Sequence, residues 1–429
     1  MKCLWVFLLL FGPLAAADEL VGGFVAHANQ HPDGKAPHTF ERAAYDGGLN
    51  RLPIGVFDSG IGGLTVLEAI LGLDEFNNET LQPGADGVPD FANERFVYFG
   101  DQANMPYGNY PKSGGTDFLR ELALKDASFV LGKRYSVDGV NRFDKPPVKA
   151  IVIACNTATA FGLDDIRAAI ASWGLPVIVV GVVEAGARGV RDAGGDSSKS
   201  LGVMATAGTC ASGAYPRMIT RTLGLAGKPV PEIVQQGGVS FAGVIEGDPA
   251  FTRTVAEEAR DEVRQLLESF SKSESAKPLG TVVLGCTHYP LALGEIRSAF
   301  DTFRKDETYA GLIAPELVFV DPARWTAREL FRELALARLR MKPGETCVLP
   351  RHWFFMSVAN PACPAARLSP DGTLEQEYKY SRKPGHLDIE DTLAVPLMPD
   401  RIPPASRQLV ETRLPLVWTS LSSAAALGE

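Results

Sequence analysis

The stretch Lys149-Ala150-Ile151-Val152-Ile153-Ala154-Cys155-Asn156-Thr157 has a counterpart in Gly280-Thr281-Val282-Val283-Leu284-Gly285-Cys286-Thr287-His288. Each is an apolar run that ends in a small residue, a cysteine and then polar side chains. The two cysteines are about one domain length apart. This echo indicates two similar units, each presenting a cysteine at the carboxyl end of a strand, which is where open α/β sheets bind ligands.

Short apolar runs alternate with helical periodicities on both sides of these stretches. Such alternation predicts an α/β fold with mostly parallel sheets. With the internal echo, it predicts two pseudo-symmetric domains whose cysteines meet one ligand in the cleft between them. Strands are expected at 54–57, 95–99, 148–154, 176–180, 201–205 and 281–284, and helices at 118–131, 164–173, 253–271 and 327–340.

The flanking and inserted segments have a different composition. Residues 18–52 are rich in Gly, His, Asn and Pro and are expected to form an extended N-terminal arm without periodicity. Residues 72–93 and 134–147 have the composition of surface insertions. After residue 341 the α/β rhythm weakens, and residues 361–429 are expected to be a C-terminal extension, either ordered or partly flexible.

Bulk composition excludes one class of function. The chain has 429 residues, 45% of them hydrophobic, and a net charge of -9, whereas a nucleic-acid binder normally has a basic face. Residues 1–17 carry a positive start, an apolar stretch and a small-residue run, which is typical of a signal peptide. We therefore expect export to the periplasm and no membrane contact after cleavage; a wrongly assigned start codon would leave the protein cytoplasmic.

The six cysteines include Cys3, within the predicted signal peptide. The remaining five are an odd number, so at least one thiol has no partner in the chain. Cys347 and Cys363 lie close together in sequence and could form a disulfide, but the sequence also allows them to be free. Cys210 is expected to be structural. No cysteines or histidines have zinc spacing, so no metal is expected.

Two opposed cysteines could racemise an amino acid, because one thiolate can remove the α-proton while a thiol delivers a proton to the other face. A free thiol titrates near pH 8.5, so it needs a helper, and Asp58 and His288 are the candidates. This scheme requires no cofactor. A lone buried cysteine is more often structural, but two cysteines in matching contexts favour catalysis.

The glycine-rich stretch Asp58-Ser59-Gly60-Ile61-Gly62-Gly63-Leu64-Thr65 follows the first expected strand. A dinucleotide-binding loop would need a third glycine where Thr65 stands. The stretch is better interpreted as a turn whose backbone N–H groups suit a carboxylate at a helix N-terminus. A tight turn without a ligand is the alternative.

Four motifs in order resemble those of glutamate racemases, over about residues 53–325, and the resemblance extends to a last strand expected at 353–360. They are Ile54–Leu67, Tyr98–Asp101 with Pro106–Gly108, Ala154–Ala158 and Leu284–Leu291. The resemblance implies a first domain at 53–182 plus 315–360, a second domain at 183–314, and the active site between them.

The resemblance also implies residue roles. Cys155 would take the α-proton from the D-enantiomer and Cys286 from the L-enantiomer, assisted by Asp58 and His288 respectively. The positions that match the family's substrate contacts are Asp58, Ser59, Tyr107, Gly108, Asn156, Thr157, Thr287 and His288. Glu246 is a weaker match to a further glutamate of the family, since the Cys-Pro that usually precedes it is absent here.

The implied substrate is glutamate, and the implied role is peptidoglycan supply, with cell wall biogenesis and cell shape depending on it. A signal peptide, two insertions and a C-terminal extension depart from that cytoplasmic role. A racemase of the same superfamily acting on aspartate or another amino acid, and an exported non-catalytic amino-acid binding protein, are the alternatives. The oligomeric state is open, and a homodimer is one possibility.

Overall fold

The computed structural model describes residues 18–193, 199–248, 251–273, 277–342 and 344–426; the predicted signal peptide, residues 1–17, lies outside them. The larger of its two main sheets has six strands. Adjacent strands of this sheet are parallel, except that the strand at one edge is antiparallel to its neighbour. The order is β12 (Thr392–Pro396), β11 (Trp353–Ala359), β2 (Phe96–Gly100), β1 (Ile54–Asp58), β5 (Ala150–Ile153) and β6 (Ile178–Gly181).

The second main sheet has four strands, all parallel, in the order β10 (Ile313–Val320), β9 (Leu279–Gly285), β7 (Ser200–Thr206) and β8 (Ile233–Gly238). Both sheets contain the same arrangement, in which the first strand in sequence lies between the second and the third, and the fourth lies beyond the third. β5 and β9 are therefore equivalent third strands; Cys286 follows β9 directly, and Cys155 follows β5 after one residue, Ala154. The expected α/β fold with two similar, mostly parallel units is confirmed.

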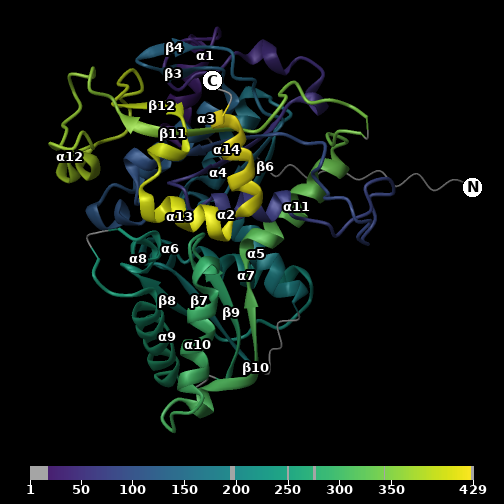
Figure 1. Ribbon diagram of the computed structural model, residues 1–429, viewed down its shortest axis with the longest axis vertical. Helices are drawn as coiled ribbons and strands as arrows, with labels where there is room; N and C mark the ends of the chain where they lie inside the picture. The colour runs from purple at the N-terminus through teal and green to yellow at the C-terminus, as the bar shows by residue number, and fades with distance from the viewer. Residues whose placement is uncertain (1–17, 194–198, 249–250, 274–276, 343, 427–429) are drawn as a thin grey trace, which may run out of the picture.

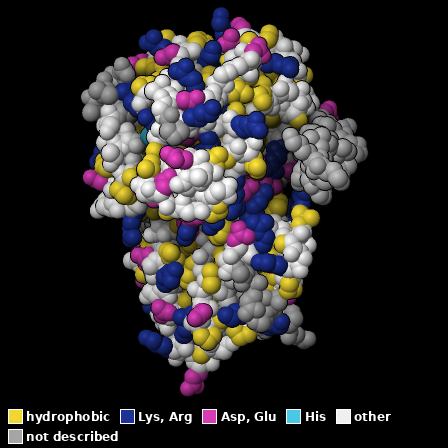
Figure 2. Space-filling view, turned by 90° about the vertical axis from the view of Figure 1, so that its right-hand side faces the viewer, with side chains coloured by type: hydrophobic (Ala, Val, Ile, Leu, Met, Phe, Trp, Pro, Cys, Tyr) yellow, Lys and Arg dark blue, Asp and Glu magenta, His cyan; other side chains and the backbone are white. Residues whose placement is uncertain are grey.

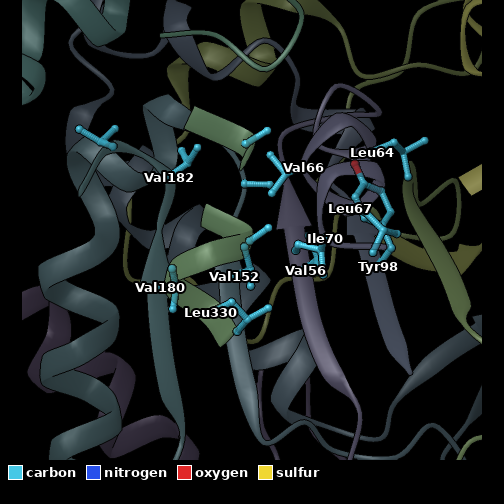
Figure 3. Close-up of a cluster of buried hydrophobic side chains, with 14 of the residues drawn as sticks. Val56, Leu64, Val66, Leu67, Ile70, Tyr98, Val152, Val180, Val182 and Leu330 are labelled. Atoms are coloured by element: carbon cyan, nitrogen blue, oxygen red, sulfur yellow. The ribbon is translucent and has the colours of Figure 1, made fainter. Parts of the chain in front are cut away.

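Helices cover both faces of the large sheet because its strands alternate their side chains between two cores. Val56 faces a core that includes α2 (Leu64–Leu71), α11 (Pro322–Leu336) and α14 (Pro415–Ala426), as the close-up in Figure 3 shows for the first two. Its neighbour Phe57 faces the opposite core, formed with α1 (Glu19–Gln30), α3 (Thr116–Leu131) and α4 (Asn156–Trp173). Continuous burial of such strands is typical of parallel sheets.

The small sheet is covered in the same way. Two helices, α5 (Val182–Asp192) and α7 (Ala214–Leu225), pack on one face, and α9 (Val255–Ser271) and α10 (Leu293–Phe303) pack on the other. The core around α5 and α11 continues from one sheet to the other. Figure 1 shows the two units stacked along the long axis, and Figure 2 shows Lys and Arg side chains gathered where the molecule narrows between them.

The expected extended arm at 18–52 is wrong for its first third. Residues 19–30 form helix α1, in which Val21, Phe24 and Ala28 recur at helical spacing and are buried against α3 and α4. Asp18 begins the helix, because its carboxylate accepts the backbone N–H of Leu20 at 2.9 Å. The two adjacent glycines at 22 and 23 concealed this apolar stripe in the sequence.

Two other boundaries also differ from expectation. Strand β10 runs to Val320 and pairs with β9, so the second unit extends past residue 314. The strand lies at the sheet edge and carries Pro315 beside a register shift, and such a proline obscures a strand in sequence. Helix α4 begins at Asn156, well before the predicted start at residue 164.

Residues 361–426 of the C-terminal extension fold onto the rest of the chain. Strand β12 extends the large sheet, and the short helix α12 (Gln376–Ser381) follows a turn. Helix α13 (Pro404–Arg413) lies at the junction of the two units, beside α8 (Phe241–Glu246). Helix α14 is fastened to α2, since Glu68 accepts the backbone N–H groups of Leu416 and Val417 at 3.1 and 2.8 Å.

The remaining elements lie around these layers. The predicted insertion at 134–147 contains the hairpin of β3 (Tyr135–Val137) and β4 (Val140–Arg142), and α6 (Ala207–Ser212) follows β7. Both Cys347 and Cys363 are free thiols, so they do not pair. None of the helices in the described ranges is long and apolar enough to cross a membrane.

Candidate active site

One cavity of about 440 Å³ lies at the carboxyl ends of the strands of both sheets. It brings together every residue that the sequence singles out as a candidate. The lining includes Asp58, Ser59, Tyr107, Gly108, Cys155, Asn156, Thr157, Glu246, Cys286, Thr287 and His288.

Cys155 is held between the end of β5 and the start of α4. It is the N-cap of that helix, and its sulfur accepts the backbone N–H of Ala158 at 3.4 Å. The thiol also donates to Ser59 Oγ at 3.6 Å. A helix N-terminus stabilises a thiolate, but burial and the nearby Asp58 carboxylate raise the pKa of Cys155 well above its ordinary value. The resting group is therefore a thiol at neutral pH.

Asp58 is the last residue of β1 and is buried beside Cys155. Burial raises the pKa of its carboxyl, while the positive charge of His288 and the N–H of Gly63 oppose that rise. The Gly63 N–H donates to Asp58 Oδ2 at 2.7 Å. The next two N–H groups of the turn are also hydrogen-bonded within the chain, since Leu64 donates to the Ile61 carbonyl and Thr65 to the Gly62 carbonyl. The expectation that this turn offers its N–H groups to a ligand carboxylate is therefore wrong for residues 63–65.

His288 connects Cys286 to Glu246. Its Nδ1 lies 3.6 Å from the Cys286 sulfur, and its Nε2 lies 2.6 Å from Glu246 Oε1. Burial alone would lower the pKa of His288, but the Glu246 carboxylate and the Cys286 sulfur raise it well above its ordinary value. The ring is therefore an imidazolium beside a sulfur atom, which is the arrangement that supports a thiolate. Glu246, the weaker sequence match, belongs to this chain of contacts.

The two units meet tightly at this point. Thr65 Oγ1 of the first unit donates to the carbonyl of Thr287 in the second, at 3.0 Å. Gly62 lies against His288, and a Cβ added at Gly62 would be 2.3 Å from Cε1 of that ring. Real Cβ atoms do not approach so closely, so any side chain at this position would force the His288 ring to move.

Asn156 and Thr157 contact the second unit directly. Tyr215 of α7 donates to Asn156 Oδ1 at 2.6 Å. Thr157 Oγ1 lies 3.1 Å from Thr209 Oγ1 and 3.4 Å from Thr206 Oγ1. These bonds place the start of α4 against the end of β7.

Tyr107 contributes to the cavity wall while its hydroxyl points into the first unit. That oxygen lies 2.6 Å from Asp101 Oδ2 and 2.7 Å from Asp126 Oδ2. A phenol has one proton to donate, and burial followed by the Asp101 charge raises the pKa of Asp126 well above its ordinary value. Tyr107 therefore donates a hydrogen bond to Asp101 and accepts one from the protonated Asp126 carboxyl, and these bonds anchor Gly108 at the cavity.

Other lining residues were missed by the sequence reasoning. Some neighbour the motifs, as Met105, Thr206 and Ala207 do, and the family motifs could have suggested them. Four come from the C-terminal extension, for which no motif gave a signal: Leu374, Gln376, Lys379 and Tyr380. Within the described ranges, no group of three or more His, Cys, Asp or Glu side chains could hold a metal ion.

The comparisons with known proteins agree with this arrangement. A family described as Asp/Glu/Hydantoin racemase matches residues 125–329. Glutamate racemase from Limosilactobacillus fermentum is 31% identical over 284 residues, which are 65% of this chain and 79% of that protein. The enzyme of that name from Thermus thermophilus is 32% identical over 284 residues, 66% of this chain and 80% of that one.

A solved structure supports the same relationship. The crystal structure of a glutamate racemase isoform from Bacillus anthracis has a TM-score of 0.50 and 25% identity, and the match covers 72% of this chain and 89% of that one. Sequence and structure thus agree along most of the length of these relatives, and the chain belongs to the glutamate racemase family.

Proposed function

We propose that this chain interconverts L- and D-glutamate by two-base proton transfer at the α-carbon, without a cofactor. The observation that carries the proposal is the position of Cys155 and Cys286. They follow equivalent strands of two similar units and line one cavity. Each has its own proton partner, Asp58 for the first and the His288–Glu246 pair for the second.

In the direction from L-glutamate, Cys286 acts as the base in its thiolate form, and the positively charged His288 ring lies 3.6 Å from its sulfur. This thiolate removes the α-proton of L-glutamate, and the Cys155 thiol delivers its own proton to the opposite face. The product is D-glutamate, with Cys286 now a thiol and Cys155 a thiolate.

The reverse direction needs Cys155 as the base. Asp58 is the residue that can accept the Cys155 proton, because burial raises the pKa of its carboxyl toward the range in which it exchanges protons. The positive ammonium of a bound amino acid would further favour a thiolate at Cys155.

The test is racemisation by purified protein, followed by circular dichroism from pure L- and pure D-glutamate, with no cofactor added. Cys155→Ser and Cys286→Ser should each lower kcat/KM by about 10²- to 10⁴-fold, the usual contribution of an acid–base group. The loss must be equal in both directions because the two enantiomers have equal free energies. Cys210→Ser is the matched control, since Cys210 does not line the cavity.

The outcomes separate the candidate functions. Racemisation of L-aspartate in preference to L-glutamate would identify the aspartate alternative. Binding of an amino acid without any racemisation would favour the non-catalytic binding protein. Normal activity after either catalytic substitution would contradict the two-cysteine scheme.

We further propose that the protein is exported after cleavage of residues 1–17, and that its D-glutamate serves the cell wall. The amino-terminal sequence of the mature protein recovered from cell fractions tests this. A mature chain that begins near Asp18 in the periplasm supports export, and an intact Met1 in the cytoplasm contradicts it.

A further inference from the structure

The C-terminal extension supplies one wall of the cavity. Leu374, Gln376, Lys379 and Tyr380 line the same space as Cys155 and Cys286. The family match ends at residue 329, so this wall lies outside it. The extension is therefore part of the cavity lining of this chain.

Helix α12 is held firmly at that wall. The ring of Tyr380 packs edge-on against Tyr110, with 4.8 Å between centroids. Its hydroxyl lies 3.4 Å from both Pro106 O and Asn109 Nδ2. The residue that follows the helix, Arg382, is also anchored, since its guanidinium donates to Asp391 at 2.7 Å and lies over the ring of Phe118. A wall fixed on this many sides can hold a side chain in one place.

Lys379 is the positively charged group on this wall. It is partly buried, and its ammonium donates to the backbone carbonyl of Met105 at 2.9 Å. An ammonium has three N–H donors, and within the described part of the chain Lys379 has no other acceptor and forms no ion pair with a carboxylate. Burial, and then the charge of Arg382, lower the pKa of Lys379. A ligand carboxylate beside Lys379 would oppose this lowering of its pKa, because a negative charge stabilises the ammonium.

The other positively charged groups of the cavity already have a partner or are exposed to solvent. His288 is paired with Glu246. Lys112, the other lysine of the lining, is exposed to solvent. A carboxylate that leaves water needs a counter-charge or strong hydrogen-bond donors, and Lys379 is the partly buried cation of the lining that is placed to provide one.

We propose that Lys379 binds the side-chain carboxylate of the substrate and that the extension thereby selects dicarboxylic amino acids. This inference rests on the proposed racemase function. The α-carbon must lie between the two cysteines, so its own carboxylate and ammonium lie near the strand ends that carry Asp58, Asn156 and Thr287. The distal carboxylate extends away from them, and the α12 wall with Lys379 is a part of the lining that lies apart from the strand ends.

Substitution of Lys379 tests the proposal in the full-length protein. Lys379→Met keeps the length of the side chain and removes the charge. It should raise KM for L- and D-glutamate about 10- to 100-fold, the effect of losing a hydrogen bond to a charged group, with a much smaller change in kcat. Lys379→Arg should restore part of the affinity. Lys383→Met, an exposed lysine of the same segment, is the matched control.

L-Glutamine provides the control ligand, because it has the shape of glutamate without the distal charge. Lys379→Met should leave the weak binding of glutamine unchanged, as measured by calorimetry. An unchanged KM for glutamate would overturn the proposal, and so would equal losses for glutamate and glutamine.

Calorimetry also separates this inference from the proposed function. A wild-type protein that binds L-glutamate without racemising it, and loses that binding in Lys379→Met, would defeat the racemase and support the role of Lys379. If the wild-type protein racemises glutamate and Lys379→Met keeps its affinity for glutamate, the racemase function is supported and the role of Lys379 is defeated.

Discussion

His288 Nε2 lies 2.6 Å from Glu246 Oε1, and both side chains are buried. The two residues are 42 positions apart in the sequence and are brought together by α8 and the end of β9. Because Nδ1 of the same ring lies 3.6 Å from the Cys286 sulfur, the imidazole links a carboxylate to a thiol. The charge of His288 therefore depends on Glu246.

Glu246→Gln removes the anion that keeps the proton on His288. Burial alone lowers the pKa of that ring, so the pKa of His288 should fall in the variant. Folding raises the pKa of His288, so protonation of this ring stabilises the folded protein. The stabilisation is complete below the pKa of an unfolded histidine, about 6.5. It is lost as the pH rises through the pKa of His288 in the folded protein. The variant's deficit in unfolding free energy should thus be largest in acid and shrink as the pH rises.

Urea unfolding, from below about pH 6.5 to above the pKa of folded His288, measures the deficit in unfolding free energy. An NMR titration of His288 measures the fall in its pKa. Glu316→Gln removes an exposed carboxylate and serves as the control. A deficit that does not change with pH, together with an unchanged His288 titration, would contradict the dependence on Glu246.

Gly62→Ala should impair catalysis without unfolding the protein. The added methyl would lie 2.3 Å from Cε1 of His288 and 2.7 Å from Oγ1 of Thr287, so the imidazole must move. Displacement of an acid–base group by about 1 Å can cost about 10²-fold in rate, and we expect a loss of kcat/KM of that order. Gly23→Ala in α1, where nothing lies within 4 Å, is the control. Full activity in Gly62→Ala would show that this contact does not position His288.

The buried pair of Lys149 and Glu94 should support stability far from the active site. Lys149 Nζ lies 2.7 Å from Glu94 Oε2, and both side chains are almost fully buried. Removing one partner of such a pair leaves an unpaired buried charge and costs about 3–5 kcal/mol. Glu94→Gln should therefore lower the free energy of unfolding by roughly that amount.

The matched control for this pair is Glu41→Gln, which breaks the more exposed pair with Lys133 and should cost less than about 1 kcal/mol. Denaturant unfolding compares the two variants. Equal small losses would mean that water or a rearranged partner satisfies the Lys149 charge.

The thiols should remain reduced in the active protein. The structure has five free cysteines among its described residues, at 155, 210, 286, 347 and 363. Labelling the denatured, unreduced protein should thus modify all five. In the native state Cys155 should react slowly, because burial and the Asp58 charge raise its pKa. A disulfide between Cys155 and Cys286 in active protein would contradict the mechanism.

Sequence alone predicted the parts of the fold that have a repeated local pattern. Strands β1, β5 and β9 are continuous apolar runs, and each ends in a polar or reactive residue, so both the sheets and the catalytic candidates were visible. β8 was not, because its Gln235-Gln236-Gly237-Gly238 end lacks apolar residues. Helix α1 was hidden by adjacent glycines, although its buried residues follow helical spacing.

The wall formed by α12 could not be predicted for a different reason. Lys379 and Met105 are joined by a contact between segments far apart in the chain, and neither segment has a motif that identifies the other. Only the folded chain shows that the extension, which looked like an appendage in sequence, reaches the cavity of Cys155 and Cys286.

The two-base mechanism makes its most direct prediction about hydrogen at the α-carbon. L-Glutamate is incubated with the protein in deuterated water, and both enantiomers are recovered early and analysed by mass spectrometry. Because the acid thiol exchanges with solvent and differs from the base, the D-glutamate should carry solvent deuterium while the remaining L-glutamate keeps its hydrogen. D-Glutamate that retains the original hydrogen, or deuterium appearing equally in both enantiomers from the start, would contradict proton transfer by two opposed cysteines.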